Sequence, residues 1–362
     1  MHTFLAVNGV LMIRYFCTYF DRHYVTLGLA LYESLRRFCP QFRLWVLCLD
    51  EETFELLSEL KLAQVRLVKL QEFEAWDKDL LVAKANRNRL EYYFTCTPML
   101  PGFVLQDAPE VEMVTYLDAD LWFFANPEGI YEEIGTHSIA IVGHRYASGA
   151  LFLEEPAGVY NVSWVSFRRD AEAMACLARW RQQCLEWCYN RSEQGRNADQ
   201  KYLDEWPNKY PNLKVIEQIG AGAAPWNIQQ YRISTKGEQI FLDDQPLYFY
   251  HFHGVKQLVP RVYDPVLSHF KARLSPLLKE LIYKSYLCRL EAISQRVIGS
   301  KKGSRYLTNL RTQNCQTSPS KELSLLRRIR RGIHVVKMVI AGIYIFIPDM
   351  GKRIAQLKND KF

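Results

Sequence analysis

The stretch VEMVTYLDAD at residues 111–120 carries the strongest indication of a fold in this sequence. Its first six residues predict a strand that enters a core, and Asp118 and Asp120 follow where that strand ends. Two carboxylates one residue apart beside an apolar strand are costly to bury unless a positive group lies between them. Mg²⁺ and Mn²⁺ suit this position, because they accept protein carboxylates together with water and phosphate oxygens. The stretch therefore predicts a divalent-cation site of the kind that holds a nucleoside diphosphate.

The residues around this stretch alternate between strand and helix patterns. Strands are expected at 12–18, 44–49, 65–70, 111–116 and 139–142, and helices at 27–38, 51–60 and 87–94, the last ended by Pro98 and Pro101. This alternation favours an α/β layered fold with a mostly parallel sheet. Ligands of such sheets bind at the carboxyl ends of the strands, where Asp118 and Asp120 are expected to lie.

Several short segments of the chain occur in an order that is familiar from known enzymes. They are Arg89-Leu90, residues 117–120, residues 160–167, Asp199-Gln200 and residues 251–254. Together they resemble glycosyltransferases of the GT-A fold, above all family eight with its glycogenin-like and bacterial galactosyltransferase-like members. The resemblance covers residues 12–260 and implies a Rossmann-like, mostly parallel sheet flanked by helices.

The sequence departs from the family pattern at a few positions. Trp164 stands where the family strand has Gly, and Lys256-Gln257-Leu258 replaces the family's Lys-Pro-Trp. The basic residue before the acidic pair is Arg89, where the family has Lys. The chain is therefore interpreted as a divergent relative, matched better in its nucleotide and metal half than in its acceptor half.

The metal site is assigned first. Asp118 and Asp120, with Ala119 between them, are predicted to bind Mn²⁺ or Mg²⁺ on the phosphates of a nucleotide sugar. The resemblance implies that His251 is the third ligand, and strand alternation makes His253 a second candidate on the same face. A cation at this position neutralises the diphosphate leaving group as charge develops in the transition state.

Further residues are assigned to the donor nucleotide. Arg89 and Lys256 are expected at the diphosphate and Gly254 in the nucleotide- or sugar-binding site, because all three lie in or near the family-like segments. Thr18, Tyr19 and Phe20 follow the first strand and are expected to line the base, while Arg22 is placed to reach ribose or phosphate. Core packing is the alternative for the aromatic residues.

The donor sugar is assigned to Asn161, Asp199 and Gln200, with Asn227 as an acceptor-side candidate. Asp199 and Gln200 are the predicted catalytic residues, since a carboxylate and an amide can bind sugar hydroxyls and stabilise a positively charged anomeric carbon. The alternative for Asp199 is that it caps a helix beginning there.

Composition divides the chain into two regions. Residues 266–362 hold 20 Lys and Arg against 5 Asp and Glu, whereas residues 1–265 carry a net charge of −8. We expect a GT-A nucleotide-sugar transferase domain at 1–265 and a helical, basic C-terminal extension at 266–362. Cys17, Cys48 and Cys96 lie in apolar patterns and are expected to be reduced core residues.

The residues near the end of the chain suggest that the protein binds to a membrane surface. Residues 327–331 are basic apart from one Ile, and the apolar stretch 333–347 follows, shorter than the ~20 residues that a spanning helix needs. Basic charge beside apolar surface suits a helix in the interface of an anionic membrane. We therefore expect a cytoplasmic protein, peripheral on the inner face of the cell membrane, with no nucleic-acid partner. The alternative is that residues 335–347 pack onto the domain as a core helix.

The predicted activity is transfer of a hexose from a UDP-linked sugar to an acceptor hydroxyl of a glycan or lipid-linked glycan, in polysaccharide biosynthesis. The resemblance implies that the reaction depends on a metal and retains the anomeric configuration. One alternative is a sugar-nucleotide nucleotidyltransferase, although such an enzyme carries a Gly-rich basic loop where residues 19–22 read Tyr-Phe-Asp-Arg. The other alternative is a non-catalytic nucleotide- or glycan-binding protein.

Overall fold

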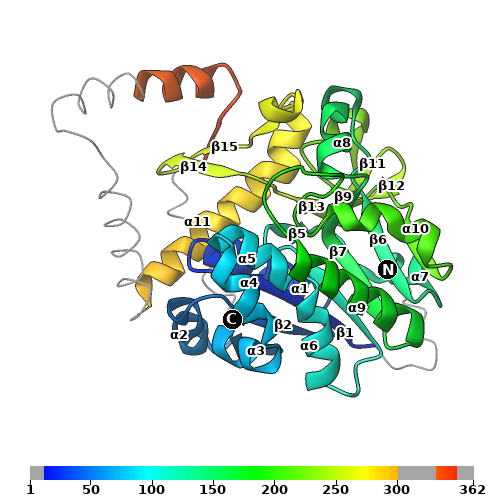
Figure 1. The fold of residues 1–362 in the computed structure, drawn as a ribbon. Helices are drawn as coiled ribbons and strands as arrows, with labels where there is room; N and C mark the ends of the chain where they lie inside the picture. Colours follow the sequence, from blue (N-terminus) through cyan, green and yellow to red (C-terminus); the bar gives the residue numbers. More distant parts are fainter. Residues whose placement is uncertain (1–11, 301–331, 349–362) are drawn as a thin grey trace.

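The computed structural model describes residues 12–300 and 332–348, whose path is shown in Figure 1. Its central sheet contains β1 (Arg14–Phe20), β2 (Phe42–Cys48), β3 (Val65–Lys69), β4 (Met113–Leu117), β6 (Ile139–Gly143), β7 (Tyr160–Arg168) and β8 (Leu213–Ile216). The strand order is β3-β2-β1-β4-β7-β6-β8, and within the described residues β7 alone runs against its neighbours. The predicted α/β class with a mostly parallel sheet is therefore confirmed.

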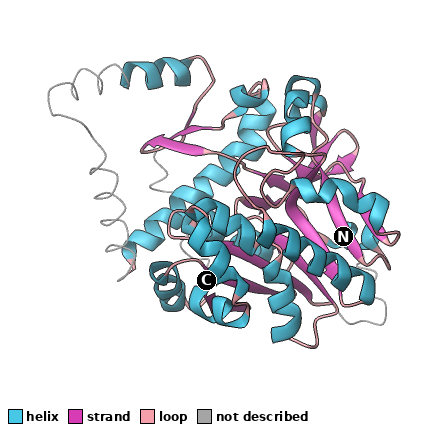
Figure 2. Cartoon of the chain, viewed as in Figure 1, coloured by secondary structure: helices cyan, strands magenta, loops and turns pink. Residues whose placement is uncertain are grey.

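Helices cover both faces of this sheet, as Figure 2 shows. The α-helices labelled in Figure 1 are α1 (Val25–Phe38), α2 (Glu51–Leu60), α3 (Leu70–Trp76), α4 (Asp79–Asn86), α5 (Arg89–Cys96), α6 (Met99–Asp107), α7 (Glu128–Ile134), α8 (Glu154–Ala157), α9 (Ala171–Glu186), α10 (Trp206–Lys209) and α11 (Lys284–Gly299). Asp50 caps α2 through the backbone N–H of Thr53, which fixes the predicted start of that helix. The prediction that Pro101 ends a helix was wrong: it lies in the first turn of α6, where its missing N–H costs nothing.

Alternate residues of each strand enter two separate cores. In β1, Phe16 packs with α1 on one face, while Cys17 packs on the other face with the core that contains α6. The same alternation separates Val46 from Leu47 in β2. Because successive side chains of a strand point to opposite faces, both sides of the sheet are buried and its ligand site must lie at an edge. Cys17, Cys48 and Cys96 are buried free thiols, as expected.

The described residues also form three smaller sheets of three strands each. One contains β5 (Leu121–Phe123), β13 (Phe249–His251) and β9 (Ala221–Ala223), in the order β5-β13-β9. A second contains β10 (Ile233–Lys236), β11 (Gln239–Leu242) and β12 (Gln245–Pro246). A third contains β14 (Lys256–Val259), β15 (Val262–Asp264) and β16 (Ile345–Phe346). The Gly-rich stretch at 220–225 contributes the buried strand β9 to the first of these sheets.

The start of the C-terminal extension shares the core of the domain. A π-helical stretch at Leu278–Tyr283 continues into α11, which packs on α1. Arg289 and Arg296 of α11 both form ion pairs with Glu33 of α1. The predicted boundary at 265/266 therefore marks a change of composition and secondary structure within one packed body.

The apolar stretch near the end of the chain divides into two parts. Residues 332–340 form a helix at the edge of the molecule (Figure 1), and β16 follows it and pairs with β15. Ile345 and Ile347 are buried in the core, and the N–H of Ile347 donates to the carbonyl of Arg261. The basic residues 327–331 lie outside the described residues. Among residues 12–300 and 332–348, no helix is both long and apolar enough to cross a membrane.

Trp164 occupies the centre of the core on the α1 face. Its ring is fully buried and stacks on Phe249 at 5.5 Å between centroids, with Phe16 and Tyr131 at its sides. The bulky side chain of Trp164 therefore fills the core and does not line the pocket described below.

We predict that Trp164→Ala lowers the free energy of unfolding by about 3–5 kcal/mol, because it removes a large side chain and leaves a cavity. Guanidinium unfolding followed by circular dichroism measures this change. The matched control is Leu151→Ala at an exposed position, which should change stability by about 0.5 kcal/mol or less. Equal effects of the two substitutions would contradict the central place of Trp164.

Candidate functional site

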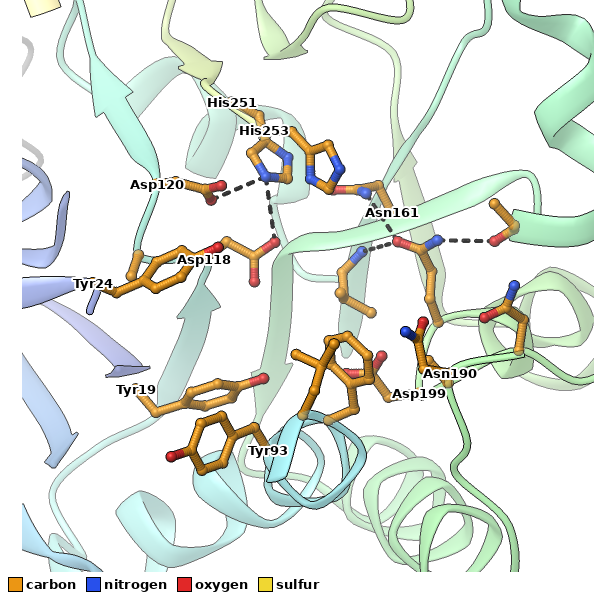
Figure 3. A pocket seen from close by; sticks show the side chains of 18 of the residues that line it. Tyr19, Tyr24, Tyr93, Asp118, Asp120, Asn161, Asn190, Asp199, His251 and His253 are labelled. Carbon is orange, nitrogen blue, oxygen red and sulfur yellow. Dashed lines mark hydrogen bonds and ion pairs between the residues drawn. The ribbon is translucent and has the colours of Figure 1, made fainter. Parts of the chain in front are cut away.

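A cavity of about 720 Å³ opens where β1, β4 and β6 reach their carboxyl ends and β7 begins. Figure 3 shows its side chains: Asp118, Asp120, His251 and His253 gather at one end, and Tyr19 and Tyr93 lie at the other. Asn161, Asn190 and Asp199 line a third side. The residues predicted from strand ends thus meet in one pocket, as the parallel sheet requires.

The acidic turn is positioned by two sheets at once. The N–H of Asp118 donates to the carbonyl of Ser163 in β7, and the N–H of Leu121 donates back to the carbonyl of Asp118. The chain then enters β5, whose Leu121 is paired with His251 of β13. This antiparallel pairing places His251 beside Asp120, although 131 positions of sequence separate them.

An ion pair forms where these segments meet. Nε2 of His251 lies 3.0 Å from Oδ1 of Asp120 and 3.7 Å from Oδ2 of Asp118. Burial by itself lowers the pKa of His251, but the two carboxylates outweigh burial and raise that pKa above its ordinary value. Burial likewise raises the pKa of Asp120, and the two histidines at 251 and 253 reverse this effect and lower it. Both shifts favour the charged forms of the pair, an imidazolium beside a carboxylate.

Two other carboxyls near this pair are protonated more easily than usual. Burial raises the pKa of Asp118 to about 6, with His251 opposing this rise. Burial also raises the pKa of Asp199 to about 7, and the charge of Asp118 contributes, while a hydrogen bond with Thr97 acts in the other direction. The main cause of both shifts is burial, which disfavours the ionised form of a carboxyl group.

A network of amides forms the side of the pocket next to Asp199. Nδ2 of Asn161 donates to Oε1 of Gln200 at 2.9 Å and lies 3.1 Å from Nε2 of His144. Nε2 of Gln200 donates to the carbonyl of Ala157. These hydrogen bonds fix the side chains of Asn161 and Gln200 before any ligand arrives, which pre-organises the polar wall.

The opposite end of the pocket is aromatic. Tyr19 and Thr97 share a hydrogen bond of 3.0 Å between their hydroxyls, and Tyr93 lies next to Tyr19 (Figure 3). The hydroxyl of Tyr93 donates to Oδ2 of the buried Asp21 at 3.5 Å. Aromatic faces beside a buried carboxylate are suited to a planar base with N–H groups.

The structure brings most of the predicted residues together. Those that line the cavity are Tyr19, Phe20, Arg89, Asp118, Ala119, Asp120, Asn161, Asp199, Gln200 and His251. Thr18 is fully buried and Arg22 is paired with Glu52 and Asp50, and neither residue lines the cavity. Gly254 and Lys256 lie beyond His253, in the turn and in β14. The roles of all these residues in ligand binding remain predictions.

Some residues of the cavity lining were not predicted from the sequence, and one predicted residue does not line the cavity. His144 and Tyr146 follow β6 directly, so the rule about strand ends would have identified them. No sequence pattern indicated that Trp226 lines the cavity, because it lies in a short buried loop and not at the end of a strand of the central sheet. Asn227, the acceptor-side candidate, is fully buried and uses its side chain on the N–H of Ala224 and the carbonyls of His144 and Gly222.

The side chains at the acidic end fit a divalent cation. One ligand atom each from Asp120, His251 and His253 lies within 4.8 Å of the others, and Asp118 adjoins this cluster. Carboxylate oxygens and imidazole nitrogens are common ligands of first-row divalent cations. A cation there would replace the proton on His251 and compensate the surrounding carboxylates.

The raised pKa of Asp199 predicts how stability depends on pH. Between its ordinary pKa near 4 and about 7, the folded chain holds a proton on Asp199 that the unfolded chain has lost, so stability falls as pH rises through this window. Asp199→Asn removes this penalty. In EDTA, we expect the melting temperature of the variant to exceed that of the wild type more at pH 8 than at pH 5, as differential scanning fluorimetry measures.

The matched control for this measurement is Asp244→Asn, at a carboxylate that is almost fully exposed on the β11–β12 hairpin. Its melting temperature should differ from the wild type by the same small amount at both pH values. A difference between Asp199→Asn and the wild type that is constant with pH would contradict the assignment.

The chain resembles known proteins both in sequence and in structure. No protein-family model matches the chain. Among solved structures, it resembles the galactosyltransferase LgtC with a TM-score of 0.43 and 12% identity, over 66% of this chain and 87% of that one. It resembles mouse xyloside xylosyltransferase 1 with a TM-score of 0.42 and 15% identity, over 67% and 98%. These partial likenesses assign neither a family nor a substrate.

Two uncharacterised proteins of Bacillus subtilis (strain 168) are similar in sequence. YfnD is 30% identical over 279 residues, which cover 76% of this chain and 88% of YfnD. YfnF is 34% identical over 248 residues, which cover 67% of this chain and 81% of YfnF. Identity of this extent shows that the chain belongs to the same protein family as YfnD and YfnF.

Proposed function

We propose that this protein is a metal-dependent glycosyltransferase of the GT-A type, which moves a hexose from a UDP-linked sugar to an acceptor hydroxyl with retention of configuration. One observation carries the proposal. Asp118, Asp120 and His251 converge at one end of a cavity whose opposite end is aromatic and whose side wall bears Asn161 and Asp199. A nucleotide sugar needs the same three surfaces, for its diphosphate, its base and its sugar.

Different residues would contact the different parts of the donor nucleotide sugar. Asp118, Asp120 and His251 would hold Mn²⁺ or Mg²⁺, which supplies charge compensation to the diphosphate when bound. Tyr19 and Tyr93 would contact the base. Arg89 lies exposed at the rim of the same cavity, where its guanidinium can approach a phosphate without displacing an ion pair of the core.

The transfer of the sugar requires polar side chains that hold it in position while its bond to the diphosphate breaks. The bond between the anomeric carbon and the diphosphate oxygen breaks, its electron pair leaves with the nucleoside diphosphate, and the acceptor oxygen forms the new bond as its hydroxyl passes its proton to the departing diphosphate oxygen. Asn161, Asp199 and Gln200 would orient the sugar during this exchange. Asp199 is suited to stabilise a positive anomeric carbon once a bound cation lowers its raised pKa and leaves it ionised.

Two substitutions test the donor site. A nucleotide sugar that binds the folded chain raises its melting temperature, so a panel of UDP-sugars should stabilise the wild type in Mn²⁺ and not in EDTA. Asp118→Asn and Asp120→Asn should abolish that stabilisation. Without metal, Asp118→Asn should hold or raise the melting temperature, because it removes a carboxyl that burial disfavours. Asp120→Asn should lower it, because His251 then loses the partner that lies 3.0 Å away.

Asp244→Asn again serves as the control and should respond to Mn²⁺ and donor as the wild type does. Full donor stabilisation in both Asp118→Asn and Asp120→Asn would remove the basis of the proposal. Product analysis separates the alternatives: release of UDP supports glycosyl transfer, consumption or release of pyrophosphate supports a nucleotidyltransferase, and binding without turnover supports a non-catalytic protein.

We also propose that the C-terminal segment holds the protein on the inner face of the cell membrane, where glycan or lipid-linked acceptors are found. The helix at 332–340 exposes Ile333, Val336 and Ile340, with 52%, 58% and 80% of their surfaces accessible. Their spacing of three and four residues places them on one face. The basic residues 327–331 precede this helix in the sequence, and β16 attaches its other end to the domain. Charge beside an apolar face fits an anionic lipid surface.

Vesicle sedimentation tests this membrane role. The wild type should sediment with vesicles that contain phosphatidylglycerol and should be released by high salt. Replacement of Ile333, Val336 and Ile340 together by Ser should abolish sedimentation and leave Ile345 and Ile347 in the core. The control is the double substitution of Leu81 and Val82 by Ser, at exposed apolar positions of α4. Equal sedimentation of the triple variant and the wild type would exclude the helix from membrane binding.

A further inference from the structure

His253 stands beside the ion pair of Asp120 and His251 because of the turn that follows β13. The N–H of Val255 donates to the carbonyl of Phe252 at 3.2 Å, and Gly254 has a φ of +73° at the third position of this turn. That conformation suits Gly, which has no Cβ to clash. The turn directs the side chain of His253 back into the cavity, next to His251 (Figure 3).

An aromatic wall holds both imidazoles in place. The ring of Trp226 meets His251 edge to face at 5.2 Å and His253 at 5.6 Å between centroids. Phe270 packs against Trp226 at 5.8 Å and against His253 at 6.3 Å. The rings of His251 and His253 are themselves perpendicular, with centroids 5.5 Å apart. Packing on these sides restricts the ring of His253 even though part of it is exposed.

The distances place His253 among the metal-binding atoms. The cluster in which all ligand atoms lie within 4.8 Å of one another consists of Asp120, His251 and His253. Asp118 lies next to it, but one of its oxygens accepts a hydrogen bond from the hydroxyl of Tyr116 at 3.0 Å. The nitrogens of two imidazoles are therefore as well placed for a cation as the second carboxylate is.

We propose that His253 is a metal ligand, so that two imidazoles and the carboxylate of Asp120 bind the cation and select a transition metal such as Mn²⁺ or Co²⁺ over Mg²⁺. This inference rests on the cation site of the proposed function. Mg²⁺ is a hard cation that favours oxygen ligands and retains its water, whereas imidazole suits first-row transition metals. For a site with two nitrogen ligands, affinity rises from Mn²⁺ to Co²⁺ in the usual order of these metals.

Calorimetric titration of the full chain with MnCl₂, CoCl₂ or MgCl₂ alone tests the proposal. The wild type should bind Co²⁺ and Mn²⁺ more tightly than Mg²⁺. His253→Ala should weaken Co²⁺ binding by at least about 10-fold, the lower limit of what changes around metal sites usually cost. Its Mg²⁺ affinity should change little, so the preference for Co²⁺ shrinks. His253→Gln, which keeps a polar side chain of similar length, should behave in the same way.

A spectroscopic readout identifies the ligand directly. Electron spin-echo modulation of bound Mn²⁺ should report couplings from two imidazole nitrogens in the wild type and from one in His253→Ala. The matched control is His269→Ala, since His269 lines the same cavity and packs against Phe270 and Phe152. This variant should keep both the wild-type metal preference and the two couplings.

The variants separate the failure of this inference from the failure of the proposed function. If Asp120→Asn binds all three cations as the wild type does, the cation site is misplaced and both proposals lose their basis. If Asp120→Asn abolishes binding while His253→Ala and His253→Gln keep the wild-type preference and both nitrogen couplings, only the role of His253 is overturned.

Discussion

The ion pair between Asp120 and His251, 3.0 Å long, is the contact on which the site depends. It joins the acidic turn after β4 to the end of β13, and the pairing of β5 with β13 keeps these segments in register. Asp118 and Asp199 line the same pocket, and the pKa values of both carboxyls are raised because burial disfavours their ionised forms. A buried pair of this kind is costly in itself, which is consistent with the cation site that we propose there.

The C-terminal extension packs against the segment that contains His251. Tyr286 of α11 stacks on Phe252 with ring centroids 3.7 Å apart, and Tyr283 shares a hydrogen bond of 3.0 Å with Tyr250 of β13. The strand that carries His251 therefore pairs with β5 and β9 in its sheet, and the π-helical stretch and α11 pack against it and the residue that follows it. Residues that composition assigns to a separate basic extension thus contribute to the stability of the site, and the helix at 332–340 is attached to the same body through β16.

Sequence patterns predicted the parts of the molecule that local chemistry determines. The alternation of apolar residues located the main parallel strands, and the acidic pair at 118 and 120 located the edge of the sheet where the pocket lies. Long-range pairing was beyond these patterns. Nothing near Ile345 indicates that it pairs with β15, and Trp164 gave no sign that it packs on Phe249 in the core. Such contacts depend on tertiary packing, which overrides local preference.

Anomalous diffraction from a crystal soaked with Mn²⁺ and UDP would locate the cation itself. We expect one strong peak between the carboxylate of Asp120 and the imidazole of His251, with the diphosphate of UDP bound to the same ion. A peak elsewhere, or UDP bound in the cavity with no ion beside Asp120, would contradict this expectation.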